Sequence, residues 1–214
     1  MAKTRRLRSG FGLSQGPCTS GFSALDLADT LGARMKLYTK NGDDGSTGLI
    51  GNVRVAKCDP RVSAYGEVDE TNAAIGLVIA QCDDKPVTAN LRRIQADLFM
   101  LGAELATPAD QVRPWAIKAS HVTQLENWID EASAISPPMK NFVLPGGHPT
   151  AARLHFARTV CRRAERSVVS LTREQAVGEW VVPYLNRLSD FLFALARAAN
   201  TKAGIDDLPW TPSP

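Results

Sequence analysis

A glycine-rich loop carries the first residues that could do chemistry. Residues 39–48 (TKNGDDGSTG) contain three glycines and three hydroxyl side chains. Glycine lets successive backbone N–H groups face one point and form an anion-binding nest, to which Lys40 adds a positive charge. Asp43 and Asp44 offer the oxygen ligands that Mg²⁺ prefers beside a phosphate. The same residues also suit a surface turn, so the loop predicts either a nucleotide-binding loop or a simple turn.

A row of arginines is the second candidate. Arg158, Arg162 and Arg166 recur at every fourth residue of a predicted helix, so they stack on one face. They flank the apolar stripe of that helix instead of lying opposite it. Stacked guanidinium groups suit a polyphosphate, although a helix flank with ordinary salt bridges remains the alternative. The net charge of +3 is too small to indicate a nucleic-acid partner.

Residues on two other predicted helices could complete such a site. Asn186 lies beside a leucine stripe, where it could bind a base, a ribose or a phosphate, and Asp190 could orient an arginine. Asp69 and Glu70 could pair with arginines of the same chain or of another. Helix capping and surface ion pairs are the alternatives for these four residues.

The histidines and cysteines indicate no metal site. His121, His148 and His155 are too scattered, and the absence of a Glu-x-x-His pair disfavours a di-iron bundle. The four cysteines form no CxxC pair, so reduced thiols in a cytoplasmic compartment are expected. Phe142, just before Leu144-Pro145-Gly146-Gly147, is expected to anchor a loop.

The elements that must position these residues are helical. Apolar residues recur at steps of three and four, with short Pro/Gly breaks, and this spacing predicts an all-α, up-and-down five-helix bundle. Asp59-Pro60 should begin the first helix and Thr150 should cap the fourth. Residues 36–39 could be a short extended piece. The predicted helices span 59–82, 86–105, 120–133, 150–171 and 183–199.

The two ends of the chain differ from this core. Residues 1–34 are rich in Arg, Gly and Ser, which suggests a disordered leader or an upstream start before Met35, or else an organelle transit peptide. Residues 35–203 form the expected domain, and 204–214 a flexible tail. No apolar run reaches about 18 residues, so no membrane span is expected.

Five blocks resemble one family, the ATP:cob(I)alamin (corrinoid) adenosyltransferases of the propanediol-utilisation type. They occur in order and cover about residues 35–203. The blocks are YTKNGDDGSTGL (38–49), RVSAYGEVDETNAAIG (61–76), FVLPGG (142–147), LHFARTVCRRAER (154–166) and YLNRLSDFLFALAR (184–197). The resemblance implies a homotrimeric bundle with active sites between subunits. It also implies transfer of the 5′-deoxyadenosyl group of MgATP to cobalt(I) of a reduced corrinoid such as cobalamin, with release of triphosphate.

The resemblance also assigns roles to residues. Arg162 would clamp the triphosphate, Arg158 would pair with Asp69 across the subunit boundary, and Phe142 would press on the lower corrin face. A reductase and a cobalamin-dependent acceptor enzyme would be partners. The residues placed around ATP are Thr39, Lys40, Asn41, Gly42, Thr47, Gly48, Lys57, Arg162, Arg163, Ala164, Glu165, Arg166, Asn186 and Asp190, while the acid that meets magnesium stays open.

Two other functions fit the same residues. A nucleotide-binding phosphotransferase would use the glycine loop and the arginines but release ADP or AMP. A cobalamin carrier or ATP-sensing bundle would bind its ligands without turnover.

Overall fold

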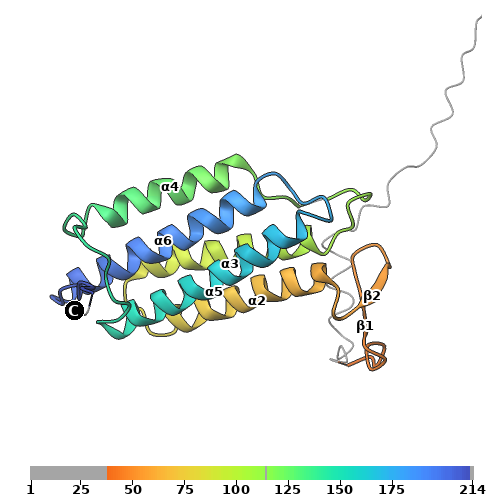
Figure 1. Cartoon of the computed structure of the whole chain (residues 1–214), viewed down its shortest axis with the longest axis horizontal. Coiled ribbons are helices and arrows are strands. Elements are labelled where there is room, and N and C mark those ends of the chain that lie inside the picture. The colour runs from red at the N-terminus through yellow and green to blue at the C-terminus, as the bar shows by residue number, and fades with distance from the viewer. Residues whose placement is uncertain (1–37, 114, 213–214) are drawn as a thin grey trace, which may run out of the picture. The chain divides into compact units, whose positions relative to one another are not determined.

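The computed structural model describes residues 38–113 and 115–212 (Figure 1). The predicted leader, the start at Met35 and half of the predicted extended piece at 36–39 lie outside the described residues. The chain divides into two units at Lys40, and the elements described below belong to the second unit, Asn41–Pro214.

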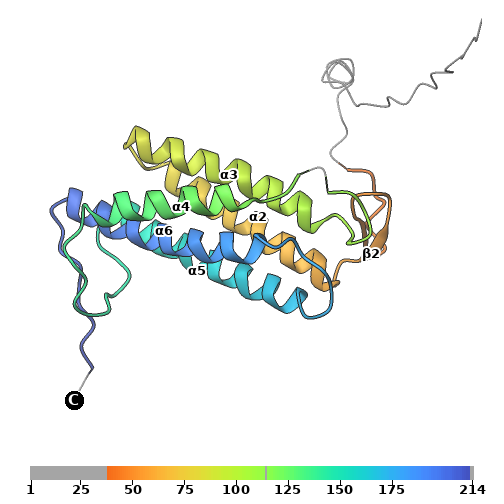
Figure 2. The same ribbon diagram turned by 90° about the horizontal axis from the view of Figure 1, so that it is seen from above.

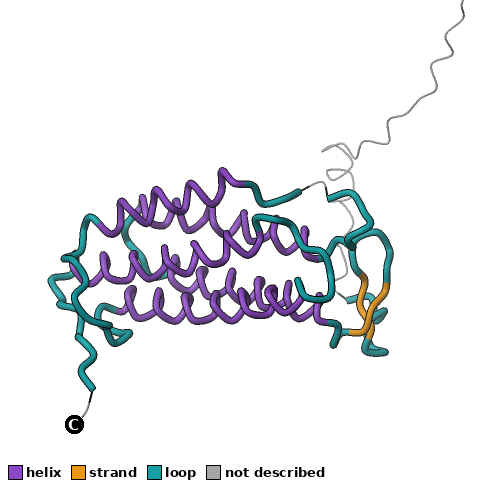
Figure 3. The backbone as a smooth tube through the Cα atoms, turned by 45° about the horizontal axis from the view of Figure 1, so that its top comes forward, coloured by secondary structure: helices purple, strands orange, loops and turns teal. Residues whose placement is uncertain are grey.

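Five helices and one small sheet make up the described part of the second unit. Consecutive helices alternate in direction, which gives the predicted up-and-down bundle (Figures 1 and 2). A two-stranded antiparallel sheet lies at one end of the bundle (Figure 3). The elements are β1 (Ser46–Gly48), β2 (Arg54–Ala56), α2 (Pro60–Ile79), α3 (Lys85–Leu105), α4 (Ala119–Ser133), α5 (Pro149–Leu171) and α6 (Val181–Lys202).

Capping side chains and prolines set where the helices begin. The Asp59 carboxylate accepts a hydrogen bond from the Arg61 amide at 2.8 Å, and Pro60 occupies the first turn of α2, as predicted. The prediction that Thr150 caps α5 is wrong. His148 is the N-cap, because Pro149 is already helical and the His148 ring accepts from the Thr150 amide at 3.3 Å.

The packing of the helices explains their apolar stripes. The strongest helix contacts follow the order α3, α2, α5, α6, α4, so α5 lies at the centre, between α2 and α6. Twelve residues of α6 are buried, and the α6 ring of Phe191 lies 5.7 Å from that of Trp128 on α4. Burial of these stripes is the main source of stability. No helix in residues 38–113 or 115–212 has both the length and the apolarity that a bilayer crossing requires.

The C-terminal segment, residues 204–212, differs from the flexible tail that the sequence predicts. Its backbone pairs with the loop before α5: the Leu144 amide donates to the Leu208 carbonyl at 2.8 Å, and the Trp210 amide donates to the Phe142 carbonyl at 2.7 Å. An isolated antiparallel bridge joins Val143 to Pro209. The segment is therefore part of the folded domain.

Candidate functional site

The glycine-rich loop forms a closed turn that leads into the small sheet. The Gly45 amide donates to the Gly42 carbonyl at 3.2 Å, and the Lys57 amide donates to the Gly45 carbonyl at 2.8 Å. A Cβ at Gly42 would lie 3.1 Å from the Ser46 carbonyl oxygen and 3.3 Å from the Lys57 Nζ. The Lys57 ammonium group therefore lies beside the turn, and a side chain at Gly42 would crowd both it and the Ser46 carbonyl.

Arg54 holds this loop together and was missed by the sequence analysis. Its guanidinium donates to the Asn41 carbonyl and to the Ser46 hydroxyl, and it forms an ion pair with Asp44 at 3.5 Å. Hydrogen bonds from Ser46, followed by the charge of Arg54, lower the pKa of Asp44. Arg54 lies opposite Gly48 in a strand of only three residues. A strand this short has no alternation of apolar and polar residues from which the sequence could predict it.

The loop residues that the family resemblance places around ATP are mostly exposed. Thr39 and Lys40 belong to the first unit, and Lys40 has a positive φ of 63°. Asn41 and Gly48 are exposed, and Thr47 is half-buried where it pairs with Val55 on β2. The exposed residues of this loop, Asn41 and Gly48 among them, are therefore accessible to solvent.

The end of α3 is bonded to the segment that connects β1 and β2. The Ile50 amide donates to the Ala106 carbonyl at 3.0 Å, just after α3 ends. Arg61 is buried under the same turn and donates to the carbonyls of Leu105 at 2.6 Å and Thr107 at 3.2 Å. The buried guanidinium fixes the turn to which the loop is attached.

The arginine face of α5 is confirmed as a feature of the fold. Arg162 and Arg166 are exposed, and neither makes a hydrogen bond or an ion pair within the described residues. Arg163 pairs with Glu70 of α2 in the same chain, and this bond raises the pKa of Arg163. Two cations on this face are therefore available to an anionic ligand.

Asn186 meets this face from α6. Its amide nitrogen donates to the Glu165 carboxylate at 3.1 Å, and Arg187 donates to its carbonyl oxygen at 3.0 Å. Asp190 is exposed one turn further along α6. A depression of about 400 Å³ lies along the same side of α5, lined by Arg162, Glu165, Arg166, Val169, Ser170 and Arg173.

Ala164 does not belong with these residues. Its side chain is fully buried in the core between the helices, because it lies in the apolar stripe of α5. The prediction that places it beside ATP is therefore corrected: Ala164 is a packing residue in this chain.

Arg158 occupies a different environment from Arg162. It is half-buried, and its guanidinium lies 5.9 Å from the ring centre of Phe193. Its Nε has no hydrogen-bond partner in residues 38–113 and 115–212. Burial, and then the charge of Arg162, lowers the pKa of Arg158. The nearby Nδ1 of His155 is likewise buried without a partner among the residues that the structure describes. Buried groups of this kind are normally satisfied by another protein group or by ordered water.

Phe142 is presented to solvent by the loop before α5. Its side chain is 76% exposed, although a large aromatic side chain normally gains from burial. The loop lies at the end of the bundle where α5 begins, and the sheet lies at the opposite end (Figure 1). The 23 residues of α5 span about 34 Å between these ends. One chain therefore does not bring Phe142 and the glycine loop together.

The residues proposed for magnesium do not form a built metal site. In the part of the chain that is described, no three His, Cys, Asp or Glu side chains gather where they could hold a metal. One oxygen of Asp44 is occupied by Ser46 and Arg54, whereas Asp43 is exposed and makes no such bond.

Comparisons with known proteins identify the family of this chain. The family model described as cobalamin adenosyltransferase matches residues 37–199. A corrinoid adenosyltransferase of Bacillus subtilis is 45% identical over 180 residues, which cover 82% of this chain and 92% of that protein. That of Mycobacterium tuberculosis strain H37Rv is 48% identical over 183 residues, covering 83% of this chain and 93% of its own.

Similar solved structures come from the same family. A variant PduO-type ATP:corrinoid adenosyltransferase from Lactobacillus reuteri, complexed with cobalamin and ATP, superposes with a TM-score of 0.79. It is 41% identical, and the match covers 83% of this chain and 100% of that one. A second variant of that enzyme, complexed with ATP, has a TM-score of 0.78 at 42% identity, covering 82% of this chain and 100% of its own. The chain therefore belongs to the cobalamin adenosyltransferase family.

Proposed function

We propose that this protein transfers the 5′-deoxyadenosyl group of MgATP to the cobalt(I) of a reduced corrinoid, giving adenosylcobalamin and triphosphate. The observation that carries the proposal is the match, over 83% of the chain, to an enzyme structure complexed with cobalamin and ATP. The free cations of α5 and the exposed Phe142 supply the chemistry that such a reaction needs.

The reaction needs positioning and charge stabilisation more than acid–base chemistry. Cobalt(I) donates an electron pair to the ribose C5′, the Co–C bond forms, and the C5′–O bond breaks with release of triphosphate. The negative charge that develops on the leaving group is stabilised by Arg162 and Arg166. Glu165 and Asn186, which are already bonded to each other, hold the nucleoside in line for attack.

The glycine loop binds the same nucleotide from the other side. Lys57 suits the phosphates, and Asn41, Gly42, Thr47 and Gly48 of the second unit form the nest beside it. Asp43 is the acid that is free to contact the magnesium of MgATP, because Asp44 is engaged by Ser46 and Arg54.

The site is completed between the subunits of a homotrimer. The loop before α5, which carries Phe142, and the small sheet lie at opposite ends of the bundle. Within the described residues, the buried Nε of Arg158 has no partner. Asp69 is exposed on α2, so it is accessible to the Arg158 of a neighbouring chain. An ion pair between them would satisfy Arg158 and bring one chain's loop to the α5 face of the next.

Phe142 acts on the corrinoid substrate. An exposed aromatic side chain beneath the corrin ring excludes water and the lower axial ligand. Loss of that ligand favours reduction of cobalt(II) to cobalt(I). A reductase that supplies this electron, and a cobalamin-dependent enzyme that accepts the product, are the partners this chemistry requires.

An anaerobic spectral assay with ATP and chemically reduced cobalamin tests the proposal. We expect the spectrum of the organocobalt product, with one triphosphate released for each molecule formed. ADP or AMP as product would indicate a phosphotransferase instead. Stoichiometric binding of both ligands without release of triphosphate would indicate a carrier.

A further inference from the structure

The loop that carries Phe142 (residues 136–148, the Phe142 loop) is not held by burial of its own side chains. Phe142 is 76% exposed, Met139 is 52% exposed and Leu144 is 43% exposed. A loop with so little buried apolar surface is mobile unless hydrogen bonds fix it. Its position, on which the proposed contact with the corrinoid depends, must therefore come from polar contacts.

One of these contacts is the short pairing with the C-terminal segment. The bonds from Leu144 to Leu208 and from Trp210 to Phe142 lie on either side of the Val143–Pro209 bridge. Two hydrogen bonds on an exposed segment form only a marginal pair by themselves. Something else must hold the C-terminal segment beside the loop.

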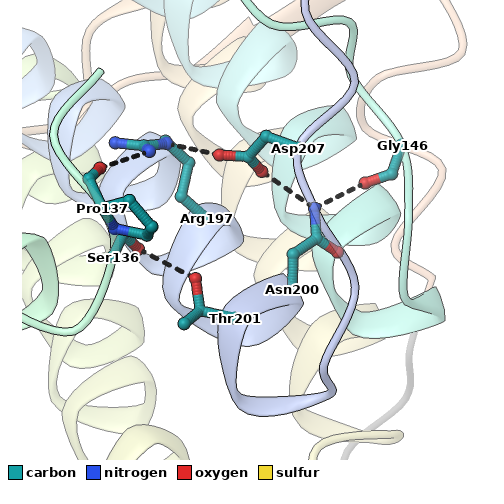
Figure 4. Close-up of polar contacts among 7 residues, drawn as sticks. All are labelled: Ser136, Pro137, Gly146, Arg197, Asn200, Thr201 and Asp207. Carbon is teal, nitrogen blue, oxygen red and sulfur yellow. Dashed lines mark hydrogen bonds and ion pairs between the residues drawn. The ribbon is translucent and has the colours of Figure 1, made fainter. Parts of the chain in front are cut away.

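Asn200, near the end of α6, makes that connection. Its side chain is 3% exposed and uses every polar atom. Oδ1 accepts from the His148 amide at 2.8 Å. Nδ2 donates to the Gly146 carbonyl and to Asp207, both at 3.2 Å (Figure 4). A single buried amide thus binds the end of the Phe142 loop and the base of the C-terminal segment.

Asp207 extends the connection to the start of the loop. Its second oxygen accepts from Arg197 Nε at 2.6 Å, and Arg197 donates in turn to the Pro137 carbonyl at 2.8 Å (Figure 4). The Arg197 and Asp207 side chains are only 13% and 16% exposed, so the pair is largely shielded from solvent. The chain of contacts fastens residues 137, 146, 148 and 207 to α6.

The Gly-Gly sequence before α5 is explained by the same amide. Gly147 has a φ of +96°, and a Cβ there would lie 2.3 Å from Asn200 Oδ1. The loop backbone therefore passes against the Asn200 side chain at a distance that only glycine permits.

We propose that Asn200 and Asp207 are positioning residues for Phe142, and that they set the place of this ring at the corrinoid without touching the substrate. The inference rests on the proposed function, because it assumes that Phe142 contacts the corrinoid. The polar chain of Asn200, Asp207 and Arg197 converts a solvent-exposed loop into a fixed part of the site.

Asn200→Asp is the first test, because it keeps the acceptor for His148 but places a carboxylate oxygen against Asp207 and the Gly146 carbonyl. Asp207→Asn is the second variant, and it lies outside the helices, so it remains informative where Asn200→Asp fails to fold. Thr201→Ala is the matched control, since its hydroxyl meets Ser136 of the same loop only at 3.5 Å.

Hydrogen exchange without ligands gives the first readout. We expect the amides of Leu144 and Trp210, which pair the loop with the C-terminal segment, to exchange on the order of tenfold faster in the variants, because that segment is no longer held beside the loop. Helical amides of α2 and α3 should be unchanged. Unchanged exchange in the loop would overturn the proposal without touching the proposed function.

Two assays of the full-length enzyme give the second readout. The variants should lose on the order of tenfold in the rate that starts from cobalt(II), while the rate with pre-reduced cobalt(I) and the KM for ATP stay near wild type. Adding Phe142→Ala should cause little further loss, since both changes act through one ring. Equal losses in both cobalt assays, or additive losses in the double variant, would overturn the proposal. If the wild-type protein shows no adenosylation activity in either assay, the proposed function itself is refuted.

Discussion

Replacing Arg162 with alanine separates the chemistry of the α5 face from the stability of the bundle. The Arg162 side chain is exposed and makes no hydrogen bond or ion pair within the described residues. Alanine also has a high helix propensity. We therefore expect the free energy of unfolding to change by no more than about 0.5 kcal/mol.

The effect on catalysis should be much larger. A guanidinium that stabilises the charge developing on the departing triphosphate contributes about 2.7–4 kcal/mol to the transition state. Its removal should lower kcat by about 10²–10³-fold. Arg162→Lys should fall between alanine and wild type, because lysine keeps the charge but lacks the bidentate geometry.

The measurement uses pre-reduced cob(I)alamin and saturating ATP, so that neither cobalt reduction nor nucleotide binding limits the rate. Urea unfolding of the same samples gives their stability. Arg92→Ala is the matched control: it removes the same exposed charge from α3, a helix that packs mainly on α2. The reasoning is refuted where Arg162→Ala keeps more than about a tenth of the wild-type kcat, or where Arg92→Ala loses as much.

Three further outcomes test other parts of the structure. Burial lowers the pKa of His155 below its ordinary 6.5, so the folded protein should lose stability as the pH falls below 6.5; in His155→Gln, urea unfolding should show a smaller loss. Gly147→Ala should reduce the free energy of unfolding by about 1–3 kcal/mol, through its positive φ and the collision with Asn200, whereas Gly146→Ala, with open space around it, should change it little in the same urea experiment. Phe142→Ala should slow adenosylation from cobalt(II) far more than adenosylation from pre-reduced cobalt(I), and equal losses would leave Phe142 without a role in ligand exclusion.

The helices were predictable because their apolar stripes are long and regular. Leu154, Ala157, Cys161 and Ala164 are all fully buried along α5, so the spacing alone indicated which face packs inward. The arginines beside that stripe followed from the same geometry. The ends of the helices were harder to predict, as the incorrect N-cap at Thr150 shows. Pro149 occupies the first helical position of α5, so the cap is the residue before it, His148.

The features that were missed depend on contacts between distant segments. Strands of three residues have no alternation to detect, so β1, β2 and the role of Arg54 were invisible in the sequence. The pairing of Leu144 with Leu208 joins residues separated by the whole of α5 and α6. The local spacing of apolar residues predicts an amphipathic helix. It does not predict which loop a carboxylate far away in the sequence, such as that of Asp207, will contact.

The placement of the glycine loop and Phe142 at opposite ends of the bundle has a genetic consequence. Where each site draws one half from each of two neighbouring chains, a chain with a damaged loop still contributes a sound α5 face to its neighbour. Two alleles that are each inactive could then restore some activity when expressed together. By the same geometry, a single damaged chain would impair sites that it shares with healthy ones, so some alleles would be partly dominant.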